Sequence, residues 1–279
     1  DASSVDPDPA SGPLAGLPTL AVSGWERIGA ALDGVPTGLA RDSATGRWLA
    51  VTDRFDVYLL DSGLTGVLHR VVVDKGFSVE LTRFTGAAFL GGDTLAVVST
   101  NKSWVLLRPD SLADPAREWR RFLETDGRVS ELARGRFGTV RARQQYVMSL
   151  AFDPAAQELI TVSVPSPRHR RLVVSRFARR DRMLASEFQP RLGGGLSLAG
   201  EDRSLAEYVV TGAAVADGRL YAVSAAHSTL LVIDLRERTV SAAYAVPSIV
   251  RPVGVAVRGT QLLVAQADGR IAVLERPAP

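Results

Sequence analysis

A short internal repeat constrains this chain more than any other sequence feature. Five segments share one pattern: a hydroxyl-bearing or apolar residue, then Gly or Ser, then two small apolar residues. They are Thr37-Gly38-Leu39-Ala40, Thr85-Gly86-Ala87-Ala88, Met148-Ser149-Leu150-Ala151, Thr211-Gly212-Ala213-Ala214 and Val253-Gly254-Val255-Ala256. Each is followed by a turn signal and two further short apolar runs. Such runs indicate buried strands, because helices need about ten or more periodic residues. The repeat therefore predicts an all-β fold.

The units also predict how the strands are grouped. Four units continue into a more polar fourth strand, over 67–73, 117–123, 183–188 and 239–246, whereas the fifth unit lacks one. The run 20–28 has no partner in its own unit, so we expect it to complete the last one. Repeats of about 40 to 45 residues with four strands each are typical of propeller blades. The predicted fold is a five-bladed β-propeller with four antiparallel strands per blade and the N-terminal strand completing the last blade.

The spacing of the repeats also suggests the domain organisation. Residues 17–279 are predicted to form a single β-propeller domain, with inserts around 126–145 and 190–206. Residues 1–16, rich in Asp, Pro, Ser and Ala, are predicted to be a disordered leader or tether. We expect the protein to be a monomer.

Composition excludes several classes of chemistry. The chain has no cysteine, which excludes disulfides, thiolate nucleophiles and cysteine-ligated metal centres. Hydrophobic residues make up 46% of the 279 residues, which is enough for a sizeable core. No run of about 18 consecutive apolar residues occurs, so no membrane-spanning helix is predicted.

The propeller topology predicts where a site would lie. Loops that lead into the inner strands and loops that join the second strand to the third share one face, and exposed loops are where binding residues concentrate. Nine candidate ligand-binding residues follow: Asp53, Arg54, Glu80, Arg83, Lys102, Glu207, His227, Arg251 and Asp268. Small hydroxyl-bearing residues, Thr37, Thr85, Ser149 and Thr211, are expected to line the channel wall. We expect a polar pocket of mixed charge at the channel mouth; the alternative is a set of solvated loop residues on a structural ring.

The same residues argue against familiar catalytic and metal centres. A glycosidase needs two carboxylates about 5 to 10 Å apart, yet no predicted inner strand carries Asp or Glu. Calcium would require oxygen ligands from separate loops to converge, namely Asp53, Glu80, Asn101, Glu207 and Asp268. The three histidines, His69, His169 and His227, lie in different units without zinc-binding spacing. No catalytic residue, metal site or cofactor is predicted.

Charge also bears on the partners. The net charge is +3, and two arginine-rich runs, at 168–171 and 179–182, flank one predicted strand. They should therefore lie on opposite faces of the ring, where they cannot form one phosphate-binding patch. Aromatic residues that could stack on bases are missing nearby. No nucleic-acid partner is expected; solvated turns, or contact with an acidic partner or an anionic membrane surface, are the preferred interpretation.

The stretch 38–54 carries a resemblance to known propellers. It contains Gly38-Leu39, Asp42, Gly46, Trp48, an apolar run and then Thr52-Asp53-Arg54. This resembles the first blade of extracytoplasmic propellers of the SdiA-regulated and phytase-like esterase groups, and the other units are similar in a generic way to YVTN-type and NHL-type propellers. The resemblance implies a bacterial, periplasmic or otherwise extracytoplasmic protein, with Asp53 and Arg54 at the pocket rim. The sequence lacks the acidic clusters that hold calcium in phytase-like and gluconolactonase-like enzymes.

Two functions of different classes remain open from the sequence. The first is a non-catalytic extracytoplasmic propeller that binds a protein partner or a small ligand at its channel mouth, either secreted or tethered to the membrane through a region before Asp1. The second is a metal-assisted hydrolase of lactones, esters or phosphoesters, with Glu80, Glu207 and Asp268 holding the metal and His227 as acid or base.

Overall fold

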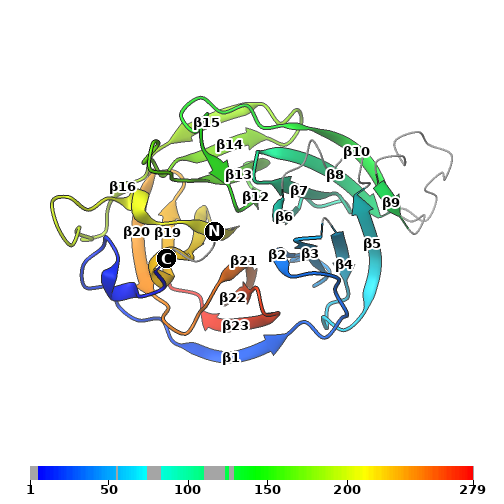
Figure 1. Cartoon of the computed structure of the whole chain (residues 1–279), viewed down its shortest axis with the longest axis horizontal. Coiled ribbons are helices and arrows are strands. Elements are labelled where there is room, and N and C mark those ends of the chain that lie inside the picture. The colour runs from blue at the N-terminus through cyan, green and yellow to red at the C-terminus, as the bar shows by residue number, and fades with distance from the viewer. Residues whose placement is uncertain (1–5, 55, 74–82, 110–122, 126–128, 279) are drawn as a thin grey trace.

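The protein is an all-β propeller, in which antiparallel sheets surround a central axis (Figure 1). The computed structural model describes residues 6–54, 56–73, 83–109, 123–125 and 129–278. The helical elements in these ranges are single 3₁₀ turns, such as η2 (Pro9–Ser11). No helix within them is long and apolar enough to cross a lipid bilayer.

The first two sheets follow the repeat along the chain. The first is an antiparallel meander of β2 (Pro36–Arg41), β3 (Trp48–Thr52), β4 (Asp56–Leu60) and β5 (Val67–Val73). The second comprises β6 (Phe84–Phe89), β7 (Leu95–Ser99), β8 (Ser103–Pro109) and β10 (Val129–Arg136).

One outer strand differs from the prediction. A fourth strand of the second unit was expected over 117–123, but the strand that pairs with β8 is β10. The short strand β9 (Leu123–Thr125) instead pairs with β5 of the first sheet. Residues 117–122 lie outside the described residues.

Two further sheets continue around the axis. One is made of β11 (Tyr146–Val147), β12 (Ala151–Asp153), β13 (Glu158–Val164), β14 (Val174–Ala178) and β15 (Leu184–Phe188). The next is made of β17 (Val210–Ala216), β18 (Arg219–Ser224), β19 (Thr229–Asp234) and β20 (Thr239–Ala245), with β16 (Arg191–Leu192) parallel to β20.

The last sheet joins the two ends of the chain. It contains β21 (Pro252–Arg258), β22 (Gln261–Gln266) and β23 (Arg270–Glu275), and its outer strand is β1 (Val22–Arg27). β21 also pairs in parallel with β2, at Gly254 and Leu39, so this sheet is hydrogen-bonded to the first in one nine-stranded sheet. β1 runs antiparallel to β23, with Trp25 opposite Ala272 (Figure 1). This is the pairing that the unpartnered N-terminal run predicted.

The hydrophobic core lies between neighbouring sheets. Leu49 and Val51 of the first sheet pack with Val97 of the second, and Val223 of β18 packs with Leu262 of β22. Each sheet is covered by neighbouring sheets on both faces. Consecutive residues of the central strands are therefore almost all buried, without the alternation of buried and exposed residues that is typical of a half-exposed sheet.

The glycines of the repeat close the axis. A Cβ on Gly86 would lie 2.6 Å from the backbone nitrogen of Leu150, and one on Gly212 would lie 2.7 Å from the Cα of Gly254. A Cβ on Gly254 would in turn lie 2.6 Å from the backbone oxygen of Leu39. Neighbouring inner strands therefore approach closely because these positions have no side chain. We call this constriction the waist.

The hydroxyl groups next to the waist are structural. Thr85 and Thr211 are buried and donate to backbone oxygens of the following sheet, Val147 O at 3.1 Å and Pro252 O at 2.6 Å. Thr37 donates within its own sheet, to Val51 O at 3.3 Å. The hydroxyls expected to line an open channel are thus mostly used to join backbone segments around a closed waist.

The N-terminal segment packs against the ring. Leu14 is buried in the core cluster between the third and fourth sheets and forms a bridge with Leu198 of the 190–206 insert. The backbone nitrogen of Ala245 also donates to Pro18 O at 2.9 Å. The prediction of a disordered leader therefore does not hold for residues 6–16, because an apolar side chain in this segment has a place in the core; residues 1–5 lie outside the described residues.

Candidate functional site

The antiparallel topology gives the ring two faces. Loops that lead into the inner strands, and loops between second and third strands, form what we call the rim face. Hairpins that join inner strands to second strands form the opposite, funnel face. Eight of the nine predicted site residues belong to the rim face; the ninth, Glu80, lies outside the described residues. No hydrogen bond or ion pair joins any two of the eight that are described.

Asp53 and its neighbours support a loop. The carboxylate Oδ1 of Asp53 accepts a hydrogen bond from the backbone nitrogen of Val35 at 2.8 Å, which fixes the connection between β1 and β2. Arg54, Arg83 and Arg251 are exposed on separate loops. Arg251 also has a left-handed backbone, with a φ of 50°.

Lys102 is a buried structural cation. Only 3% of the residue is exposed, and its Nζ donates to Ala142 O at 2.8 Å, Arg143 O at 3.2 Å and Thr139 Oγ1 at 3.2 Å. Burial, assisted by the nearby charge of Arg136, lowers the pKa of Lys102 to about 8. The side chain binds backbone oxygens of the loop after β10 instead of facing a pocket.

Glu207 and His227 lie close together, and each has a local role. Glu207 completes a capping box at η4 (Leu205–Glu207) by accepting from Ser204 N at 2.8 Å, and it pairs with Arg203 at 2.7 Å. Although burial opposes it, these contacts and His227 lower the pKa of Glu207. His227 Nδ1 lies 3.0 Å from Ser11 Oγ of the docked N-terminal segment.

Asp268 stabilises the turn before β23. Its carboxylate accepts from the backbone nitrogen of Arg270 at 3.0 Å and pairs with the Arg270 side chain at 2.7 Å. Within the described part of the chain, no three His, Asp or Glu side chains gather in a group that could hold a metal ion. Asp53, Lys102, Glu207 and Asp268 thus each bind a nearby backbone group, and none of the eight described candidates lines a cavity found among the described residues.

A concave site lies at the other end of the axis. Just beyond the waist, the inner strands diverge around a cavity of about 470 Å³, which we call the axial funnel. The fourth position of every repeat contributes an alanine to its wall: Ala40, Ala88, Ala151, Ala214 and Ala256. Apolar neighbours such as Phe89, Phe152 and Val257 extend the wall. Small side chains around the axis leave the space open, and the closed waist forms its floor.

Two arginines bring positive charge to the funnel. Arg41 ends β2 and lies over the Trp48 ring, with Cζ 6.0 Å from the ring centre. Burial and the charge of Arg258 lower the pKa of Arg41. Arg179 donates to Gln157 Oε1 at 3.0 Å and Gly91 O at 3.3 Å, and lies over Phe152 at 5.7 Å. In the described part of the chain, neither arginine has an ion pair with an acidic side chain.

A second cavity adjoins the funnel between the second and third sheets. It is lined by Leu90, Thr94, Leu106, Gln157, Arg179, Arg180 and Arg182. We call it the arginine cleft. Leu90, Gln157 and Arg179 line both cavities, so the cleft and the funnel meet at these residues.

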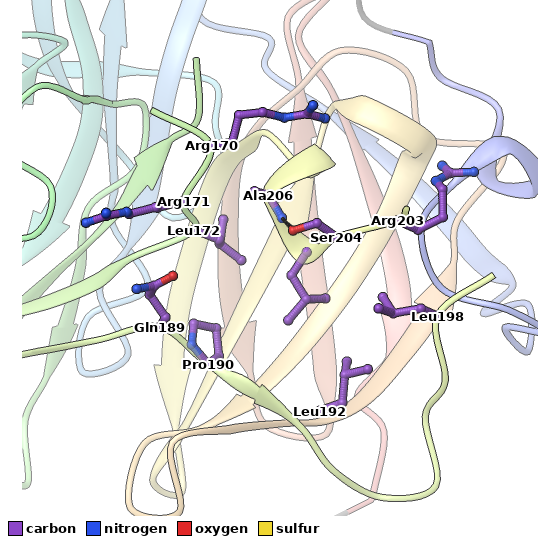
Figure 2. Close-up of a pocket in the computed structure, with 11 residues that line it drawn as sticks. Arg170, Arg171, Leu172, Gln189, Pro190, Leu192, Leu198, Arg203, Ser204 and Ala206 are labelled. Atoms are coloured by element: carbon purple, nitrogen blue, oxygen red, sulfur yellow. Dashed lines mark hydrogen bonds between the residues drawn. The ribbon is translucent and has the colours of Figure 1, made fainter. Parts of the chain in front are cut away.

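A smaller groove lies between the third and fourth sheets (Figure 2). Its volume is about 220 Å³, and its centre is formed by leucines, among them Leu172, Leu192 and Leu198. Arg170, Arg171 and Arg203 lie at its margin (Figure 2). Arg203 is already bound to Glu207 and to Ser11 O at 2.6 Å, so the N-terminal segment uses part of this edge.

The funnel is not among the sites that the sequence predicts. Its signal was present in the repeat, because the fourth position is alanine in all five units. The repeated alanine predicts only a strand at each of these positions, whereas in the structure the five alanines also surround one cavity. Arg179 belongs to a basic run, and its contact with Gly91 depends on packing between two sheets that the sequence does not encode locally.

Comparison with known proteins supports the fold. No protein-family model matches the chain, and no curated protein matches it in sequence. Among solved structures, glutaminyl cyclase from Myxococcus xanthus is similar, with a TM-score of 0.60 and 12% identity over 92% of this chain and 96% of that one. The Cps50 (Swd1) β-propeller domain of Myceliophteria thermophila is similar with a TM-score of 0.50 and 13% identity, over 91% of this chain and 68% of that domain. The β-propeller fold is thereby confirmed; at these identities the likeness concerns the fold alone.

Proposed function

We propose that this protein is a non-catalytic binding module that holds a small ligand with an apolar body in the axial funnel. The observation that carries the proposal is the ring of five alanines above a closed waist, which borders a cavity of about 470 Å³. The wall combines these alanines with polar residues such as Arg41, Asp42 and Gln157. Ligand sites are typically concave, largely apolar cavities of about 300 to 1,000 Å³ with a few polar groups. The funnel has this size and a few polar groups, and none of the cavities found among the described residues is lined by the rim-face candidates.

Two finer features belong to the same proposal. The ring is taken to have five blades, whose inner strands are β2, β6, β12, β17 and β21. An extracytoplasmic location is proposed on the resemblance of residues 38–54 to extracytoplasmic propellers.

The test is calorimetric titration of the protein with 1-hexanol, 1-heptanol and 1-octanol as neutral apolar probes. Burial of each added methylene contributes about 0.8 kcal/mol, so the affinity should rise about fourfold per methylene. The variant Ala214→Phe fills part of the funnel and should abolish binding, whereas Ala185→Phe, on the exposed outer strand β15, should leave it unchanged. Binding of 1-octanol to Ala214→Phe with the wild-type affinity would contradict the proposal.

A further inference from the structure

We propose that the ligand of the axial funnel carries an anionic group, a carboxylate or a phosphate monoester, and that this group lies in the arginine cleft. The inference rests on the proposed function, because it assigns the apolar body to the funnel. It adds the charge of the ligand and the direction in which the ligand lies.

The first support is the position of Arg179 where the two cavities meet. Its guanidinium lies over Phe152, a funnel residue, and the same side chain lines the cleft. Its hydrogen-bond partners are neutral, the amide oxygen of Gln157 and the backbone oxygen of Gly91. These contacts hold the guanidinium in place without neutralising its charge.

The second support is Arg182, which brings another cation to the cleft. Its left-handed backbone, with a φ of 60°, turns the side chain back toward its own loop. Nη1 donates to the backbone oxygens of Arg179 at 3.0 Å and Arg180 at 2.9 Å, and the guanidinium lies 4.9 Å from the Trp104 ring centre. Its Nε is buried without a hydrogen-bond partner in the described structure. Neutral groups therefore position this cation as well.

Three acidic side chains lie nearby. Asp181 pairs with Arg180 at 3.1 Å, and Arg47 pairs with Asp93 at 2.6 Å and with Asp42, which lines the funnel, at 3.9 Å. The described lining of the cleft itself contains three arginines and no acidic residue, so positive charge is in excess there. Guanidinium groups bind carboxylates and phosphates with two parallel hydrogen bonds, and such bonds are stronger where apolar walls exclude water.

The geometry thus fits an amphiphile. Its apolar body would contact the alanine ring, while its anionic end would pass Leu90 and Gln157 to reach the two arginines. An anion would add negative charge beside Arg179 and Arg182, whereas a neutral ligand would not.

The experiment compares octanoate, octyl phosphate and 1-octanol by calorimetric titration of the whole protein. Hydrogen bonds to charged groups contribute about 1.5 to 3 kcal/mol, so at least one anion should bind about 10- to 100-fold more tightly than 1-octanol. The tighter of the two anions identifies the preferred group. Arg179→Gln should abolish this preference, measured as the ratio of the anion and 1-octanol affinities in the same variant, while Arg179→Lys should retain part of it.

Controls separate the inference from the proposed function. Arg236→Gln, an exposed arginine on another sheet, should keep the preference. If neither the anions nor 1-octanol bind, the proposed function and the inference are both overturned. If 1-octanol binds as tightly as both anions, only the inference fails. A preference that survives in both Arg179→Gln and Arg182→Gln would place the anion outside the cleft and also overturn the inference.

Discussion

The two faces of the ring use polar residues in opposite ways. On the rim face, charged side chains such as Asp53, Lys102 and Glu207 are each bound to a nearby backbone group, so they support loops. On the funnel face, Arg41 and Arg179 border a cavity lined by alanines and have no ion-pair partner among the described residues. A concentration of charged loop residues therefore need not indicate a site; a cation without an ion pair beside an open cavity is the stronger indication.

The waist separates the two faces, and adding a side chain to one of its glycines should have the largest effect on stability. In Gly86→Ala, the new Cβ would meet the backbone of Ser149 and Leu150 at 2.8 and 2.6 Å. Backbone cannot yield as a flexible side chain can, so we expect the free energy of unfolding to fall by about 3 kcal/mol or more. Urea denaturation followed by circular dichroism measures this change.

The matched control for the waist is Gly138→Ala. Nothing lies within 4 Å of a Cβ at Gly138, so its free energy of unfolding should stay within about 0.5 kcal/mol of the wild type. Equal stability of the two variants would show that the inner strands are farther apart than described.

The next effect concerns the buried cation of the rim face. The pKa of Lys102 is lowered from its ordinary value of 10.5 to about 8, mainly by burial, with Arg136 adding to the effect and Glu187 opposing it. Between these pH values the unfolded chain binds a proton that the folded protein has released, so stability gains with rising pH. Relative to Lys102→Met, the wild type should gain roughly 2 kcal/mol between pH 8 and pH 10.

Chemical denaturation of both proteins across this pH range tests the expectation. Parallel pH profiles for the wild type and Lys102→Met would mean that Lys102 is solvated and could serve the rim-face pocket after all. Affinity for 1-octanol should be the same in both proteins, because Lys102 does not line the funnel.

The smallest effect is expected at Asp53. Asp53→Ala removes the acceptor for the backbone nitrogen of Val35 and should lower the free energy of unfolding by about 1 kcal/mol. Arg54→Ala, at the exposed neighbouring position, should change it by less than about 0.5 kcal/mol. Thermal unfolding distinguishes the two. Loss of octanoate or 1-octanol binding in either variant would indicate that the binding site lies on the rim face and not in the funnel.

The sequence was sufficient for much of the fold because the repeat is periodic and local. Short patterns such as the one that begins at Gly38 predict the strands after each repeat glycine and the turns between them. The unpartnered run around Trp25 predicts the pairing of β1. The outer strand β10 was not predicted because the segment that joins it to β8 is longer than the segment that joins the third and fourth strands in the other units. The docking of Leu14 was missed because a single apolar residue in a polar segment has no periodicity to detect.

The site was less predictable, for a physical reason. Loop chemistry identified residues that could bind something, yet whether a charge is already neutralised depends on partners that come together only in three dimensions. Asp268 and Arg270 form a turn within two residues, whereas Arg179 meets Gly91 of another sheet. The sequence shows the residue types, and folding decides which of them remain free to bind.

The pairing of β1 with β23 also has a consequence for how the molecule folds. Residues 22–27 and 270–275 are separated by nearly the whole described chain, so joining them costs more loop-closure entropy than any hairpin in the ring. During synthesis, β1 emerges first and cannot find its place until the final strand is made. We expect the earlier sheets to be organised by then, so that this last strand pair fastens the circle and converts a row of neighbouring sheets into a single cooperative unit.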